Sequence, residues 1–97
     1  MPKLFSYGTL CDPFIQNQIL DRELPGTPAE AQGYTLKEII IEGKKYPAAY
    51  ESVTGKITGS IFEINDVELQ KIDDYEGDSY KRIHDPTLQA WLYILAS

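Results

Sequence analysis

The chain has 97 residues, of which 42% are hydrophobic and 25% are charged. These proportions are typical of a folded domain with a small hydrophobic core, and they exclude an intrinsically disordered chain. The net charge is −6, and no run of Lys or Arg interrupts the sequence. Because nucleic acids and anionic membrane surfaces attract basic proteins, we expect neither as a partner.

The location of the protein is predicted from what its sequence lacks. No segment is apolar over the ~20 residues that a transmembrane helix needs, and the first residues do not resemble a secretory signal. Cys11 is the single cysteine, so no internal disulfide and no cysteine metal cluster can form. We therefore expect a cytoplasmic protein. The sequence leaves the oligomeric state open.

The first quarter of the chain predicts a strand followed by a helix. Residues 3–7 are rich in apolar and aromatic side chains, and Gly8 interrupts them. Asp12 and Pro13 then form a helix-start signal, because Asp caps free amides and Pro suits the first helical turn. Apolar residues at helical spacing follow, so we expect a short helix near 13–20.

The rest of the chain predicts more strands and a second helix. Strands are expected near 34–41, 46–52, 56–64, 80–84 and 88–95, separated by turns at residues 42–45, 54–55 and 85–86. A helix is expected to start at Asn65-Asp66 and to stop by Gly77.

These elements define the expected architecture. Residues 1–97 form a single α+β domain of about six or seven strands and two short flanking helices. A small mixed sheet that curls into a partly closed β-barrel buries the apolar strand faces best.

The turn Tyr7-Gly8-Thr9-Leu10 is the first candidate binding site. A strand that ends in this way exposes successive backbone N–H groups, which suit an anion or a developing oxyanion. Gly8 lets a ligand approach the backbone closely because it has no Cβ. The alternative is a purely structural turn with Tyr7 packed in the core.

Other chemistry is weakly supported by the sequence. Cys11 and Ser6 are conceivable nucleophiles with His84 as a base, but no Gly-x-Ser-x-Gly turn is present. Asp12, His84 and Asp85 do not have the spacing of a metal site. We therefore expect no metal and no cofactor.

Four motifs together resemble the γ-glutamylcyclotransferase-like family, and within it the small γ-glutamylamine cyclotransferase branch. They are Tyr7-Gly8-Thr9-Leu10, Tyr46-Pro47-Ala48, the stretch from Asp73 to Arg82 that contains Glu76-Gly77 and Tyr80, and Ala90-Trp91-Leu92-Tyr93. Their order and spacing match from residue 4 to residue 95, nearly the whole chain.

The resemblance implies a small mixed barrel and a reaction that needs no cofactor. The α-amine of a small-molecule γ-glutamyl substrate attacks its own γ-carbonyl, releases an amine or amino acid, and forms 5-oxoproline. By match, Glu76 is the general base, and Tyr7, Gly8, Thr9 and Leu10 hold the glutamyl group. Nearby acids Asp73, Asp74 and Asp78 are expected to raise the pKa of Glu76.

Two alternatives to catalysis stay open. One is a binding protein that keeps the pocket for a small carboxylate or amide without turning it over. The other is a structural or interaction domain, in which the acidic helix end is only a solvated terminus.

Overall fold

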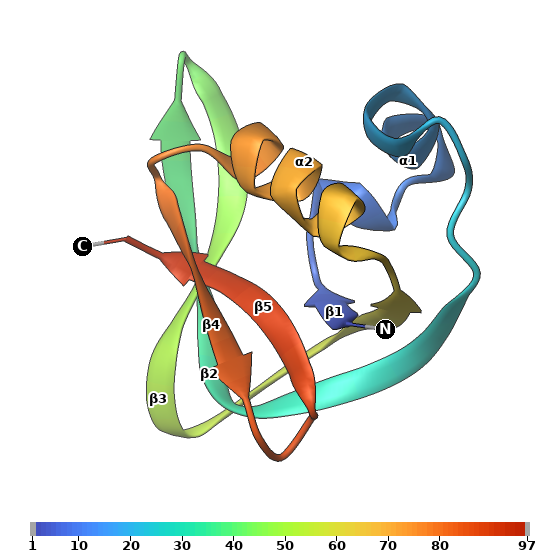
Figure 1. The fold of residues 1–97 in the computed structure, drawn as a ribbon. Coiled ribbons are helices and arrows are strands. Elements are labelled where there is room, and N and C mark those ends of the chain that lie inside the picture. The colour runs from blue at the N-terminus through green and yellow to red at the C-terminus, as the bar shows by residue number, and fades with distance from the viewer. Residues whose placement is uncertain (1, 97) are drawn as a thin grey trace.

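The computed structural model describes residues 2–96 and confirms the α+β class. In these residues the elements run β1 (Lys3–Ser6), the 3₁₀ turn η1 (Thr9–Cys11), α1 (Pro13–Leu20), β2 (Gly26–Ile41), β3 (Lys44–Glu63), α2 (Asp66–Glu76), β4 (Tyr80–Asp85) and β5 (Ala90–Leu95). Figure 1 shows the strands curling around one another while α1 and α2 lie together on one side.

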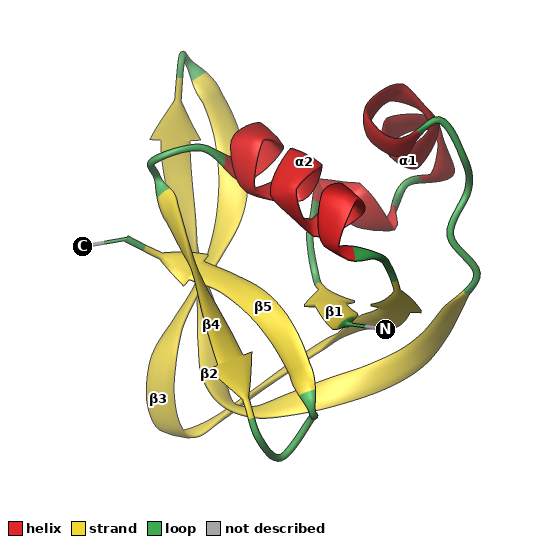
Figure 2. Cartoon of the chain, viewed as in Figure 1, coloured by secondary structure: helices red, strands yellow, loops and turns green. Residues whose placement is uncertain are grey.

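The strands of this described region form one open sheet in the order β2-β3-β1-β5-β4. The β1–β5 pair is parallel, through Leu4 and Trp91, and the other neighbours are antiparallel. The short β1 therefore lies in the middle of the sheet, and its carboxyl end opens toward the helices (Figure 2).

Both expected helices form, and their boundaries follow from local capping. The Asp12 side chain accepts a hydrogen bond from the amide of Phe14, and Pro13 occupies the first turn of α1. At α2, the Asn65 side chain accepts from the Glu68 amide while Glu68 accepts from the Asn65 amide. This capping box starts α2 at Asp66, and Gly77 ends it.

The strand count is five within residues 2–96 rather than six or seven, because β2 and β3 are long and bent. The expected turn at Thr54-Gly55 is instead an irregularity inside β3. Residues 52–55 lie opposite Gly33, where the register between the two strands shifts. A Cβ on Gly55 would lie 2.2 Å from the carbonyl oxygen of Tyr34, so this glycine permits a close approach of two backbones.

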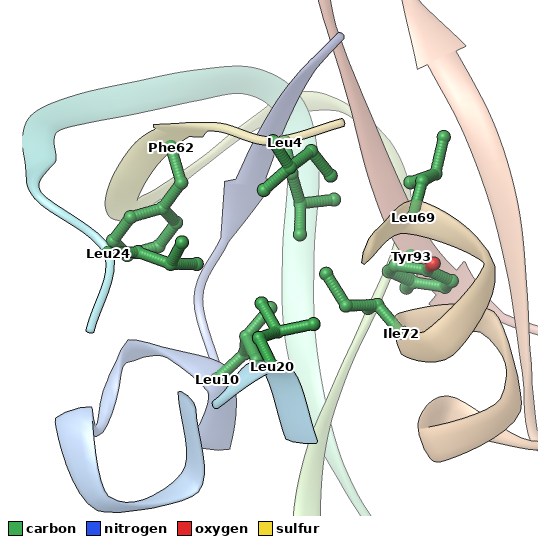
Figure 3. Close-up of a cluster of buried hydrophobic side chains, with 9 residues drawn as sticks. Leu4, Leu10, Leu20, Leu24, Phe62, Leu69, Ile72 and Tyr93 are labelled. Atoms are coloured by element: carbon green, nitrogen blue, oxygen red, sulfur yellow. The ribbon is translucent and has the colours of Figure 1, made fainter. Parts of the chain in front are cut away.

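Two apolar clusters form on the two faces of the sheet. Alternate residues of a strand point to opposite faces, so Leu4 and Tyr93 meet the helices while Phe5 and Leu92 face the inside of the curl. Figure 3 shows the helix-side cluster, in which Ile72 of α2 lies close to the ring of Tyr93. This packing fixes the last turn of α2, which ends in Glu76, against β5.

Candidate active site

A hollow where β1 ends, which we call the inner hollow, gathers residues from several elements. Its lining residues are Phe5, Ser6, Tyr7, Gly8, Pro47, Glu76, Tyr80 and Tyr93. Its volume is about 30 Å³. Since a cavity needs roughly 10–15 Å³ to hold one water molecule, the inner hollow accommodates a group of about the size of a carboxylate.

The turn after β1 supplies one wall of the inner hollow. The amides of Cys11 and Asp12 bond to the carbonyl oxygens of Gly8 and Thr9 and form the short η1 turn. Among the backbone hydrogen bonds of turns, loops and caps in residues 2–96, none is donated by the amides of Gly8, Thr9 or Leu10. A Cβ on Gly8 would approach nothing more closely than the Pro47 side chain, at 4.0 Å. The space in front of Gly8 is therefore the inner hollow.

The Tyr7 hydroxyl links two strands beside the site. Its hydroxyl donates to the carbonyl oxygen of Tyr93 at 2.7 Å and accepts from the amide of Ala49 at 2.9 Å. Burial raises the pKa of the Tyr7 hydroxyl well above its usual value. The hydroxyl thus stays protonated and ties the end of β1 to β3 and β5.

The side chains of Thr9 and Leu10 lie away from the inner hollow. The Thr9 hydroxyl shares a 2.6 Å hydrogen bond with the hydroxyl of Tyr75. Leu10 is 1% exposed and belongs to the helix-side apolar cluster. The structure therefore brings Tyr7 and Gly8 to the inner hollow, whereas Thr9 and Leu10 are not among its lining residues.

Glu76 is the carboxylate of the site. As the last residue of α2 it is half-buried, and it lines the inner hollow together with Gly8. Burial raises the pKa of Glu76 to about 7 from an ordinary value of 4.5. The expected direction is thus found, but its cause is burial rather than neighbouring acids. Asp73, for example, forms an ion pair with Arg82 at 3.3 Å.

Two tyrosines complete the walls, and the sequence did not assign them to the site. The Tyr80 hydroxyl donates to the Pro47 carbonyl oxygen at 2.7 Å, and burial raises its pKa to about 12. The Tyr93 hydroxyl donates to Asp73 at 2.5 Å. The signal was present in two motifs, the stretch from Asp73 to Arg82 that contains Tyr80 and the Ala-Trp-x-Tyr motif that ends in Tyr93.

In residues 2–96, neither Cys11 nor Ser6 forms a side-chain hydrogen bond with His84, the base that the sequence offered for them. The Cys11 thiol is exposed and donates to the Ser6 carbonyl oxygen at 3.2 Å. His84 packs edge-on against Trp91, with ring centroids 4.9 Å apart, and does not line the inner hollow.

Residues 2–96 hold neither a metal-ligand cluster nor a membrane-spanning helix. They contain no group of three His, Cys, Asp or Glu side chains arranged to hold a metal ion. No helix in the same part of the chain is both long enough and apolar enough to cross a membrane.

Solved structures with the same fold place the protein in a class of small α+β domains. The solution structure of At3g28950.1 from Arabidopsis thaliana superposes with a TM-score of 0.78 at 27% identity, covering 97% of this chain and 61% of that one. Protein ytfP from Escherichia coli shares the fold, with a TM-score of 0.64 at 24% identity over 98% of this chain and 83% of that chain.

Sequence comparison then identifies the family. The profile described as "Gamma-glutamyl cyclotransferase, AIG2-like" matches residues 4–97. The chain therefore belongs to the AIG2-like γ-glutamyl cyclotransferase family, as the four motifs predicted.

The curated relatives are longer than this chain. Protein AIG2 C of Arabidopsis thaliana is 33% identical over 81 residues, which are 82% of this chain and 48% of the relative. AIG2-like protein A of the same plant is 30% identical over 81 residues, again 82% and 48%. The chain thus spans about half the length of the curated relatives it matches.

Proposed function

We propose that this protein is a γ-glutamyl cyclotransferase that acts on a γ-glutamyl amine or amide. The α-amine nitrogen attacks the γ-carbonyl carbon, the bond from that carbon to the leaving nitrogen breaks, and the glutamyl part closes into 5-oxoproline. The observation that carries the proposal is a half-buried Glu76, with a pKa of about 7, on a hollow bounded by the turn at Gly8.

Glu76 is suited to move the proton that this reaction requires. An α-amine has a pKa of about 7.7–8.0 and is mostly protonated at neutral pH, when it cannot attack. A base whose pKa lies near 7 exchanges a proton with such an amine at little cost. In the proposed reaction Glu76 accepts a proton from the α-ammonium group and donates it to the leaving nitrogen. The attacking nitrogen loses a second proton as the ring closes, and the released amine takes it up as an ammonium, so no water, oxidant or reductant is consumed.

The turn after β1 is proposed to stabilise the developing oxyanion. Among the turn and loop hydrogen bonds of residues 2–96, none is donated by the amides of Gly8, Thr9 or Leu10, and N–H donors that are fixed before the reaction are effective oxyanion stabilisers. The tyrosine hydroxyls that line the inner hollow already donate to protein groups. They therefore shape the inner hollow and keep its walls neutral.

Replacement of Glu76 by Gln tests the proposal. The variant keeps the size of the side chain but cannot accept a proton, so kcat should fall by about 10² to 10⁴. Substrate affinity should stay within a few fold, because the turn rather than Glu76 holds the glutamyl group. The measurement is mass-spectrometric detection of 5-oxoproline from a panel of γ-glutamyl amides, with Asp74→Asn as the control for an exposed acid on the same helix.

The pH dependence of the wild-type protein provides a second readout. Since the base must be ionised, kcat/KM should rise with pH and level off above about 7.

A Glu76→Gln variant that retains nearly the wild-type rate would rule out Glu76 as the base. Ligand binding without 5-oxoproline from any amide would instead identify a non-catalytic binding protein.

A further inference from the structure

An ion pair beside the inner hollow has no role in the mechanism so far. The guanidinium group of Arg82, on β4, lies 3.3 Å from one carboxylate oxygen of Asp73, on α2. The other carboxylate oxygen of Asp73 accepts a hydrogen bond from Tyr93, which lines the inner hollow. Asp73 also precedes Glu76 by three residues in the same helix, a spacing at which two side chains are neighbours.

We propose that Asp73 and Arg82 are positioning residues for Glu76. As a pair they cancel each other's charge next to this carboxyl group and hold the Tyr93 hydroxyl on Asp73, so that Glu76 is left for the substrate. This inference rests on the proposed cyclotransferase function. It adds two residues that lie outside the lining of the inner hollow and act through Glu76 and Tyr93.

Arg82 is held by more than its ion pair. Its guanidinium group also lies over the Trp91 ring, 4.5 Å from the ring centre, and Trp91 packs against the helix-side apolar cluster. The Arg82 side chain is 28% exposed and that of Asp73 is 27% exposed. Water and salt therefore screen this pair less than an ion pair on the open surface.

Glu76 itself has no such partner. No side-chain hydrogen bond or ion pair of residues 2–96 involves its carboxyl group, and burial is the cause that raises its pKa. A free charge on Asp73 would raise this pKa further, because a like charge one turn away disfavours ionisation. Asp74 and Asp78 are exposed, so solvent screens their charges. The other titratable side chains that line a hollow together with Glu76 are all tyrosines, namely Tyr7, Tyr46, Tyr75, Tyr80 and Tyr93.

The Tyr93 hydroxyl connects the ion pair to the site. Burial and then the hydrogen bond to Asp73 raise the pKa of this hydroxyl, the Arg82 charge opposes the rise, and Glu76 adds to it. Because Asp73 accepts its hydrogen bond, Tyr93 donates to the acid whose charge is compensated. A hydrogen bond donated to Glu76 would instead stabilise the ionised form and make it a weaker base.

Titration of Glu76 tests the inference without any turnover. The ¹³C NMR signal of its carboxyl carbon, identified by its absence from Glu76→Gln, reports the pKa directly. In Arg82→Met the charge of Asp73 is uncompensated, so the pKa of Glu76 should rise by about 0.5–1. In Asp73→Asn the cation is left instead, and the pKa should fall by a similar amount. The variant with both substitutions should return close to the wild type.

The pH profile of activity provides a second readout. Near pH 6, kcat/KM of Arg82→Met should be about 3- to 10-fold below that of the wild type, and the two should converge above about pH 9. A purely structural defect would lower kcat/KM at every pH. Arg82→Lys should restore most of the wild-type profile because it keeps the charge. Lys81→Met is the matched control, since Lys81 is the exposed neighbour of Arg82 in β4 and does not line the inner hollow.

The outcomes separate the two proposals. Thermal unfolding shows which variants are folded, and Asp73→Asn, which keeps an oxygen for the Tyr93 hydroxyl, decides the question if Arg82→Met is not. An unchanged pKa of Glu76 in the folded variants would overturn the inference and leave the cyclotransferase standing. Absence of 5-oxoproline from wild-type protein would overturn the cyclotransferase, and with it the catalytic role of the pair, whatever the titrations show.

Discussion

At the scale of single residues, Glu76 holds a carboxyl group where its charge is unfavourable. Burial raises its pKa to about 7, from 4.5 for an ordinary glutamate. The folded protein therefore keeps a proton that the unfolded chain releases between these two pH values. Burial of this carboxyl group therefore lowers the stability of the ionised protein.

The sign of this effect gives a prediction for Glu76→Gln. Because the folded state binds more protons, the wild-type free energy of unfolding should fall as pH rises from about 4.5 to 7. The side chain at position 76 of the variant has no ionisable group, so the variant should be more stable than the wild type by about 1–3 kcal/mol at pH 8. The difference should vanish near pH 4.5. Urea unfolding at both pH values measures it, and a constant offset between the two proteins would contradict it.

At the scale of elements, the sequence predicts the helices and strands whose boundaries are set by residues at their own ends. Helix α2 was expected at its observed place because Asn65 and Gly77 are signals at its own ends. The continuation of β3 through Gly55 was not expected, because a glycine at this position is typical of a turn. Its actual role, a close approach to the Tyr34 backbone, depends on a residue 21 positions earlier in the chain and leaves no local signal.

In the candidate site, too, sequence motifs predict some residues, whereas others are brought together only by the fold. Tyr7, Gly8 and Glu76 were expected from the motifs, and they do line the inner hollow. The position of Leu10 in the core was not foreseen, since a motif does not say which way each side chain points. A second hollow, lined by Ile41, Tyr46, Tyr75, Glu76 and Tyr80, was missed altogether, because the β2–β3 turn and α2 come together only in the folded chain.

The turn between β1 and η1 provides the prediction at this scale. In Gly8→Val, the added side chain would extend from a backbone with φ −120°, which any residue adopts, into the inner hollow. Affinity for a γ-glutamyl amide should fall about tenfold or more, since the loss of one or two hydrogen bonds has this effect. The melting temperature should change little. Gly8→Ala should show a smaller loss, and unchanged affinity in folded Gly8→Val would remove the turn from the site.

At the scale of the whole molecule, tyrosine side chains hold together strands that are not neighbours in the sheet. Tyr80 of β4 donates to β3, and the Tyr7 hydroxyl joins β3 to β5. Tyr34 of β2 donates to Asp85 of β4 at 2.9 Å. Strands β2 and β4 are the opposite edges of the described sheet. The backbone ladder is open, and this side-chain bond brings its two edges together in a partly closed barrel.

Tyr34→Phe should therefore weaken the closure of the sheet without changing the chemistry. Both partners are buried, with Tyr34 7% and Asp85 8% exposed, so the variant leaves a buried carboxylate oxygen without this donor. A hydrogen bond to a charged group contributes about 1.5–3 kcal/mol, and the free energy of unfolding should fall by that amount.

Tyr50→Phe is the matched control for this loss, because the Tyr50 side chain is 41% exposed. Its free energy of unfolding should stay within about 0.5 kcal/mol of the wild type. In both variants kcat/KM for a γ-glutamyl amide should be preserved at 25 °C, since neither tyrosine lines the inner hollow. Equal stability of the two variants in urea would show that the bond between the edges contributes nothing to closing the sheet. A selective loss of activity in folded Tyr34→Phe would instead show that the curl of the sheet sets the geometry around Glu76.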